Sequence, residues 1–206
     1  MKNVFFLLMF CLVFTAWGQH DEAHVDELTQ EFKQKLTDRG VSSFFSATRY
    51  CSGRIEMFKI GDTMCTSKGT YYEVYMVWQE EGQAFLKKID NCGLYYSVEL
   101  EDGSIYDDFI SQVSDLIVEE VKHYKSESYT GKPALRKKAE PCFRKYQFTY
   151  GENSFSKSYN LFDISNASDG RNLNFDHNQS LKVVKLDAKL DELLAKYEVG
   201  MRRQLK

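Results

Sequence analysis

Residues Thr70–Leu100 carry the pattern that decides the fold: TYYEVYMVWQEEGQAFLKKIDNCGLYYSVEL. Side chains alternate in type along this stretch, and a period of two is the spacing of a β-strand with two different faces. Turn-forming residues at Glu81-Gly82 and Asn91-Cys92-Gly93 interrupt it. The strands that result are expected over 70–79, 83–90 and 93–100. Because their connections are short, they should pair antiparallel.

The same period continues on both sides of this stretch. Upstream, two further strands are expected over 43–51 and 54–60, which makes a five-strand meander. Downstream, a hairpin is predicted about Gly151-Glu152-Asn153, followed by a short strand over 181–186. Alternation is cleanest in the strand over 93–100. Its apolar face is formed by Leu94, Tyr96, Val98 and Leu100.

Three stretches instead place apolar residues at steps of three and four, the spacing of an amphipathic helix. The first spans 21–38, the second 104–121, and the third follows Asp187. Ser104 and Asp187 are expected to cap the second and third helices, since their side chains can accept a hydrogen bond from the first turn. The stripe of the first helix consists of Val25, Leu28, Phe32 and Leu36.

The helix over 104–121 gives the sharpest expectation about burial. Phe109, Val113 and Ile117 lie at the centre of its apolar stripe and should pack against the sheet. The opposite face is acidic and should be solvated. The acidic residues expected to be exposed are Asp108, Asp115 and Glu119.

Taken together, these elements predict an α+β fold. A mostly antiparallel β-sheet, formed by the five-strand meander plus the later hairpin, should pack with an N-terminal, a central and a C-terminal helix. The chain has 206 residues, of which 43% are hydrophobic and 28% charged, so it has the composition of a globular protein rather than of a disordered one. Residues 19–206 are expected to form a single α+β domain.

The first eighteen residues have the pattern of a cleavable signal peptide. Lys2 precedes an apolar run over Val4–Phe14, which is too short to span a bilayer comfortably. Ala16 and Gly18 supply small residues at the −3 and −1 positions of a cut after Gly18. We therefore expect a secreted or periplasmic protein with no transmembrane segment in its mature chain.

Cleavage would leave an even number of cysteines, which favours disulfides in an exported protein. The four are Cys51, Cys65, Cys92 and Cys142. If the strands over 70–79 and 83–90 pair about their turn, Thr70 lies near Cys92, and a bend before Thr70 brings Cys65 within reach. The sequence thus predicts a Cys65–Cys92 disulfide. The other two cysteines would be partners of one another or free thiols.

Several kinds of chemistry lack support in the sequence. A net charge of −3 gives no reason to expect nucleic acid as a partner. Neither a G-x-G-x-x-G nor a Walker motif is present, and no cofactor is expected. His20 and His24 lie four residues apart and could bind a metal, but two ligands at a fraying helix start are a weak signal, so no metal site is predicted.

The only support for catalysis in the sequence is the presence of residue types that catalytic sites use. A nucleophile needs a base within reach, and Cys142 with His177 is one such pair, although a disulfide at Cys142 would remove the nucleophile. The acidic face of the helix over 104–121 is better explained by solvation than by a catalytic carboxylate pair. A non-enzymatic protein is favoured, and a small secreted hydrolase with unidentified catalytic residues is the alternative.

Sheet tyrosines are the candidate ligand-binding residues. Tyr71, Tyr75 and Tyr95 could form a flat aromatic platform, because aromatic side chains concentrate in binding surfaces. The alternative is that they stabilise the sheet through cross-strand pairs. The leading hypothesis is an exported binding protein whose partner is an unknown protein, a glycan or a small apolar ligand. In another alternative, a helix lying on a curved sheet encloses a cavity that carries a hydrophobic ligand.

Overall fold

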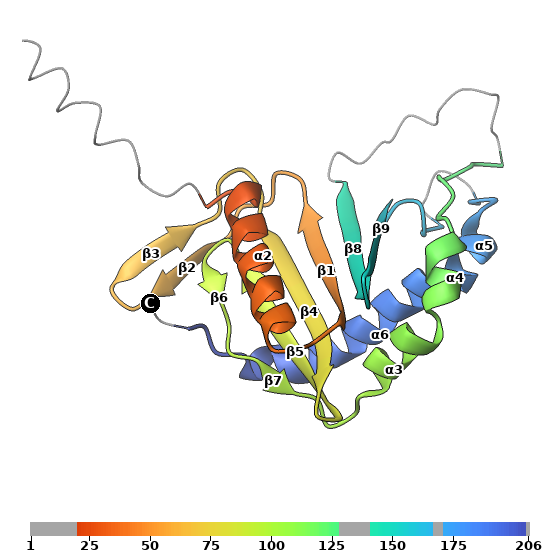
Figure 1. Ribbon diagram of the computed structural model, residues 1–206. Coiled ribbons are helices and arrows are strands. Elements are labelled where there is room, and N and C mark those ends of the chain that lie inside the picture. The colour runs from red at the N-terminus through yellow and green to blue at the C-terminus, as the bar shows by residue number, and fades with distance from the viewer. Residues whose placement is uncertain (1–19, 128–140, 167–170, 205–206) are drawn as a thin grey trace, which may run out of the picture.

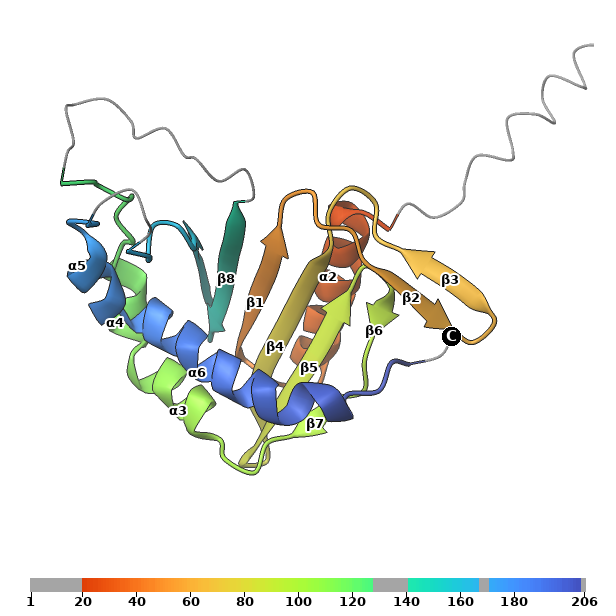
Figure 2. The ribbon, with the colours of Figure 1, turned by 180° about the vertical axis from the view of Figure 1, so that it is seen from behind.

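The computed structural model describes residues 20–127, 141–166 and 171–204. The predicted signal peptide, residues 1–18, lies outside the described residues. The predicted α+β class is confirmed: one antiparallel sheet has helices on both faces (Figures 1 and 2). Its strand order is β6-β5-β4-β1-β8-β9, and β7 also pairs with β5. The strands of this sheet are β1 (Ser43–Cys51), β4 (Tyr72–Glu80), β5 (Gln83–Asp90), β6 (Gly93–Leu94), β7 (Val98–Glu99), β8 (Cys142–Tyr150) and β9 (Asn153–Asn160).

The first half of the chain does not form a simple row of five strands. β2 (Met57–Ile60) and β3 (Thr63–Thr66) make a separate two-stranded hairpin, so β1 pairs with β4 rather than with the strand that follows it. β1 is buried on both faces, with Phe44 3% and Phe45 0% exposed, whereas Met57 in β2 is 60% exposed. A strand that is buried on both faces needs a partner along its whole length. β4 is long enough to be that partner, whereas β2 is not.

The prediction of one continuous strand over 93–100 is wrong. It divides into β6 and β7, because the chain turns away from β5 after Tyr95, whose N–H still donates to the Lys88 carbonyl at 2.9 Å, and meets the C-terminal tail instead. Tyr95 forms a bridge with Arg203, and Tyr96 N–H donates to the Arg202 carbonyl at 2.8 Å. Backbone groups need partners, and here a segment distant in sequence supplies them.

Helix α2 (Glu22–Asp38) covers one side of the sheet, which we call the α2 face (Figure 1). The predicted stripe is buried in a core with β1, β4 and β5. Asp21 caps the helix by accepting a hydrogen bond from His24 N–H at 3.3 Å, and Gly40, at φ 84°, lets the chain turn back toward β1. The stripe residues, with exposed fractions of 0–8%, are Val25, Leu28, Phe32 and Leu36.

Four helices and a short 3-10 turn lie on the opposite side, which we call the α6 face. Figure 2 shows α6 crossing one end of the strands and leaving the other end of β1, β4 and β8 without a covering helix. The elements on this side are α3 (Ser104–Ser111), α4 (Val113–Val118), α5 (Phe175–Ser180), α6 (Lys182–Tyr197) and η1 (Glu198–Gly200).

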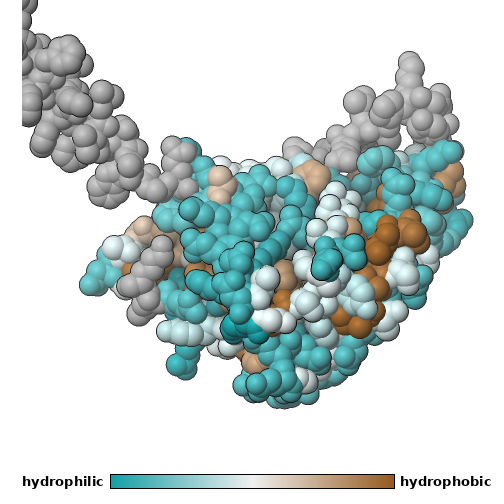
Figure 3. Space-filling model, viewed as in Figure 1, coloured by the Kyte–Doolittle hydropathy of each residue, from teal (hydrophilic) through white to brown (hydrophobic). Residues whose placement is uncertain are grey.

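The predicted central helix is broken at Gln112 into α3 and α4. Phe109 is buried as expected, but Ile117 is 51% exposed, because after the break Leu116 takes the buried position. Val113 is only half-buried. The exposed side chains of α4 form part of the apolar patch that Figure 3 shows over this helix.

Of the acids expected to be exposed on these helices, only Asp115 is exposed, with 61% of its side chain accessible. Asp108 is half-buried and pairs with Lys189. Ser104 does not cap α3. Instead, Asp102 accepts hydrogen bonds from the N–H and the hydroxyl of Ser104, at 2.8 and 2.9 Å.

The predicted strand over 181–186 and the Asp187 cap are both wrong. The helix begins at Lys182, and Asp187 lies inside it at only 4% exposed. Glu119 supplies the cap, since its carboxylate accepts hydrogen bonds from the N–H groups of Lys182 and Val183 at 2.7 and 2.6 Å. No local pattern identifies a cap that comes from a residue so far away in sequence.

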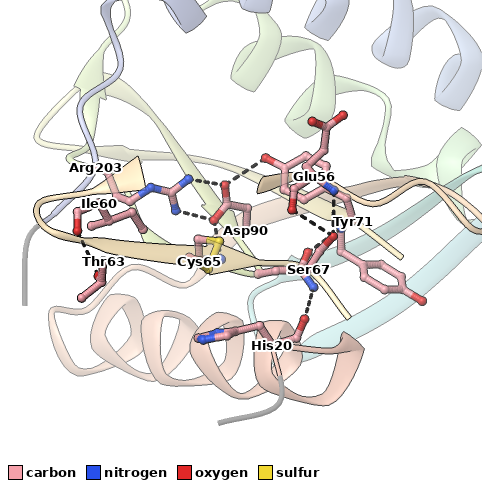
Figure 4. The surroundings of a disulfide bond; sticks show 12 residues. His20, Glu56, Ile60, Thr63, Cys65, Ser67, Tyr71, Asp90 and Arg203 are labelled. Carbon is pink, nitrogen blue, oxygen red and sulfur yellow. Dashed lines mark hydrogen bonds and ion pairs between the residues drawn. A yellow bond between two sulfur atoms is a disulfide. The ribbon is translucent and has the colours of Figure 1, made fainter. Parts of the chain in front are cut away.

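Two disulfides join segments of the described chain that are distant in sequence. Cys65 is joined to Cys92, the pairing that the sequence predicts, with 5.8 Å between their Cα atoms. This bond ties the β2–β3 hairpin to the turn between β5 and β6 (Figure 4). The second disulfide joins Cys51 to Cys142, which stand opposite one another on β1 and β8.

Replacing both Cys65 and Cys92 with serine should lower the free energy of unfolding by about 2–4 kcal/mol, because the disulfide closes a long loop in the unfolded chain. The two cysteines are 27 residues apart. Urea unfolding of the variant and of the wild type, with the Cys51–Cys142 bond intact in both, measures the difference. An unchanged urea midpoint would contradict this expectation.

Candidate functional site

A cleft of about 320 Å³ lies where α6 meets the uncovered end of the sheet. One wall comes from β1, β4 and β8, and the other from the second half of α6 and η1. Its charged and hydroxyl-bearing lining residues are Arg49, Tyr50, Arg54, Tyr71, Glu73, Tyr75, Arg144, Asp191 and Glu198. The cleft is therefore mainly polar.

Alternation along neighbouring strands explains why charges gather at this end. On the α6 face, β1 presents Phe45 and then Arg49, and β8 presents Phe148 and then Arg144. The phenylalanines lie in the core beneath the helices, and each arginine lies four residues, or two strand repeats, farther along, in the cleft. Residues directly opposite one another share a face, so Arg49 also neighbours Glu73 of β4.

Asp187 of α6 holds the arginines in place. Its Oδ1 accepts hydrogen bonds from Arg49 Nη2 at 2.6 Å and from the Tyr146 hydroxyl at 2.7 Å, and its Oδ2 accepts from Arg144 Nε at 3.1 Å. Arg49 also pairs with Asp191. Burial alone would lower the pKa of Arg49, but the charges of Asp187 and Asp191 outweigh it and raise that pKa.

A second charged group lies beside the first. Lys88 Nζ of β5 donates to Glu73 Oε1 at 2.6 Å and to Glu198 Oε1 at 2.5 Å, and the Tyr75 hydroxyl donates to Glu198 at 2.8 Å. Although burial opposes it, the ammonium group of Lys88 holds the pKa of Glu198 below its usual value. Lys88 and Glu198 therefore both stay charged at neutral pH.

Asp90 organises the third group, next to the Cys65–Cys92 disulfide. Figure 4 shows the guanidinium of Arg203 pointing at the Asp90 carboxylate, with Nη2 to Oδ2 at 2.6 Å. The hydroxyls of Tyr71 and Tyr95 donate to the same oxygen at 2.9 and 3.2 Å. Burial and the charge of Asp90 raise the pKa of Tyr95 to about 12. This network fixes the C-terminal tail to the sheet.

The three tyrosines predicted from the sequence do not form an exposed platform. Tyr71 is 4% and Tyr75 1% exposed, and the hydroxyls of both are held by carboxylates. Tyr71 and Tyr75 nevertheless line the cleft, whereas Tyr95 does not and is joined to Tyr71 only through Asp90. Charged groups therefore cover the tyrosines, and a role of Tyr71, Tyr75 and Tyr95 in ligand binding stays a prediction.

Sequence reasoning missed the residues that organise the cleft: Arg49, Arg144 and Asp187. A signal for them exists. Each is a charged residue that continues an apolar pattern: Asp187 lies at helical spacing between Val183 and Leu190, both fully buried. A charge on an apolar stripe indicates a buried partner on another element.

Other candidates from the sequence are weaker in the structure. Cys142 is in a disulfide and offers no thiol to His177, whose ring Nε2 lies 3.3 Å from the Glu120 carbonyl. The rings of His20 and His24 lie 5.1 Å apart. Among the described residues, no group of three or more histidine, cysteine or acidic side chains is arranged to hold a metal ion.

A larger hollow, of about 680 Å³, lies at the other end of the strands. It is formed by the turn after α2 and by the turn between β4 and β5. The ion pair there, Arg39 with Glu80 at 3.3 Å, has side chains that are 48% and 25% exposed. Solvent screens such a pair, so this hollow lacks the buried, fixed charges of the cleft.

Comparisons of the chain with protein-family models, with curated proteins and with solved structures found no match. In the part of the chain that the structure describes, none of the helices has both the length and the apolar character needed to cross a membrane. The cleft itself is the basis for inferring a function.

Proposed function

We propose that this chain is an exported, non-enzymatic binding protein whose ligand occupies the cleft between α6 and the sheet. One observation carries the proposal: charged side chains at the mouth of the cleft are held by buried partners yet remain open to solvent. The side chain of Asp191 is 58% exposed and that of Glu198 43%, while Arg49 and Lys88, which hold them, are 9% and 7% exposed. Groups fixed before a ligand arrives lose little entropy when it binds.

The chemistry of the cleft favours binding over hydrolysis. A carboxylic general acid needs a raised pKa, whereas the pKa of Glu198 is lowered by Lys88. All four described cysteines are in disulfides, so they supply no thiolate nucleophile. No histidine is among the described residues that line the cleft.

The cleft also favours a polar ligand over the hydrophobic cargo of a carrier. The helices and the sheet fill the space between them with their own side chains, and the largest of these are 0–1% exposed on both faces: Trp78 and Met76 on the α2 face, and Tyr75 and Phe109 on the α6 face. The cleft beside these cores is lined mainly by charged groups and tyrosines. An apolar molecule placed there would desolvate them without replacing their hydrogen bonds.

Export is supported by the two disulfides, since such bonds persist in oxidising compartments. We expect the exported protein to begin at Gln19, with or without cyclisation to pyroglutamate, and N-terminal sequencing or intact-mass analysis of the exported fraction measures this. Recovery of the full-length chain inserted in the membrane would contradict export.

Binding at the cleft is tested with a defined panel of probes on the exported protein: neutral oligosaccharides, carboxylated and sulfated oligosaccharides, and short peptides. For any probe that binds, the double variant Arg54→Ala/Asp191→Ala should weaken affinity at least about tenfold, because it removes two charged hydrogen-bonding groups. Both side chains are 58% exposed, so the fold should survive.

The matched control is Arg171→Ala/Asp176→Ala, which removes an arginine and an aspartate outside the cleft whose side chains are more exposed, at 64% and 85%. It should bind like the wild type. Equal affinity in both double variants would place the ligand elsewhere, and release of cleaved products from a probe would favour the hydrolase.

A further inference from the structure

Resting on the proposed function, we infer that the cleft takes a neutral polyhydroxylated ligand, that is, a carbohydrate without charged substituents. The first argument is electrostatic. Each arginine that lines the cleft already has an acidic partner: Arg49 and Arg144 share Asp187, and Arg54 pairs with Glu56 at 2.7 Å. Among the described residues that line the cleft, the arginines are balanced by carboxylates, so no excess of positive charge is left to attract an anion.

The second argument is the hydrogen-bonding capacity that these pairs leave open. Glu73, Asp191 and Glu198 each bind their partners through one carboxylate oxygen, and the other oxygen has no partner within the described residues. Arg54 and Arg144 each keep one terminal nitrogen without a partner there. The cleft therefore offers free acceptors and free donors side by side.

A hydroxyl group matches this arrangement because it donates and accepts at once. A sugar hydroxyl can donate to a carboxylate oxygen of the cleft while it accepts from a guanidinium. An ionised sulfate or carboxylate group only accepts, and it would meet the carboxylates of Glu73, Asp191 and Glu198 as like charges, as a phosphate would too.

The walls and the floor of the cleft agree with this class of ligand. Leu161, Leu194 and Ala195 line it, and they offer an apolar surface to the C–H groups of a sugar ring. At the floor, Arg49 is 8% exposed, and its Nε is buried without a partner among the described residues. A volume of about 320 Å³ is at the small end of ligand sites, which suits a sugar unit better than an extended lipid chain.

The variant that separates a neutral from an anionic ligand is Asp191→Asn. It keeps the shape of the side chain and replaces a carboxylate oxygen by an N–H donor. Affinity for a neutral oligosaccharide, measured by titration calorimetry, should fall about tenfold. Between low and high salt the wild-type affinity should change less than about twofold, since screening acts on charged ligands. The control is Asp176→Asn, an exposed aspartate outside the cleft, which should leave affinity unchanged.

The neutral class would be overturned if only carboxylated or sulfated oligosaccharides or acidic peptides bind, and if Asp191→Asn strengthens that binding while salt weakens it. The cleft would then still be a binding site. If no probe of the panel binds, or if the cleft variants leave the affinity of every binding probe unchanged, both the ligand class and the proposed function are contradicted.

Discussion

Replacing Asp187 with alanine is expected to lower the free energy of unfolding by about 3–5 kcal/mol, because it leaves two buried guanidinium groups without their shared counter-charge. Asp187 is 4% exposed, and the side chains of Arg49 and Arg144 are only 9% and 15% exposed. The Tyr146 hydroxyl, which donates to the same carboxylate, would lose its acceptor as well. Urea unfolding at neutral pH measures the loss.

Asp191→Ala is the matched control for Asp187→Ala. It removes an aspartate from the same helix that pairs with the same arginine, but its side chain is 58% exposed. Solvent screens the exposed Asp191 carboxylate, and Arg49 keeps Asp187 as its counter-charge, so this variant should lose no more than about 1 kcal/mol. Equal, small losses in the two variants would show that buried charge pairing does not hold α6 to the sheet.

Phe109→Ala is expected to cost about 3–5 kcal/mol, the range for removing a phenylalanine from a packed core. Phe109 is 0% exposed, and its ring lies 5.5 Å from the rings of both Phe45 and Phe148. It therefore joins α3 to two central strands of the sheet. Such a loss is a large part of the 5–15 kcal/mol, roughly, that stabilises a domain.

Two variants on α4 serve as controls for Phe109→Ala. Asp115→Ala and Ile117→Ala change exposed residues, with Ile117 at 51% exposed, and each should alter stability by less than about 0.5 kcal/mol. A loss at Ile117 as large as that at Phe109 would mean that the helix over 104–121 is continuous, as its sequence pattern suggests, with Ile117 against the sheet.

Local patterns were sufficient for the elements that bury one regular face. The stripe of α2 is buried along its whole length, β1 and β5 form at their predicted bounds, and β8 and β9 form the hairpin predicted about Gly151-Glu152-Asn153. Amphipathic periodicity decides such elements because each needs only a face of the right spacing and an apolar neighbour. The Cys65–Cys92 pairing was also accessible, since a tight turn fixes the register of β4 against β5.

Contacts between distant segments decided the rest. Glu119 caps α6 from 63 residues away, which makes a helix of a stretch that alternates like a strand. The C-terminal tail pairs with Tyr96 and divides the strand that looked cleanest in sequence. A backbone group is satisfied by whichever partner the fold brings to it, and the identity of that partner is not written in the neighbouring residues.

The candidate site depended on tertiary structure most of all. The sequence by itself determined an α+β chain with alternating sheet faces, and it pointed to the face that carries Tyr71 and Tyr75. Only the fold decided that α6 crosses one end of this face and that Asp187 meets Arg49 across 138 residues of chain. The physical reason is that a charge is tolerated in a core only when its partner is also there, and partners on separate elements meet only after those elements pack.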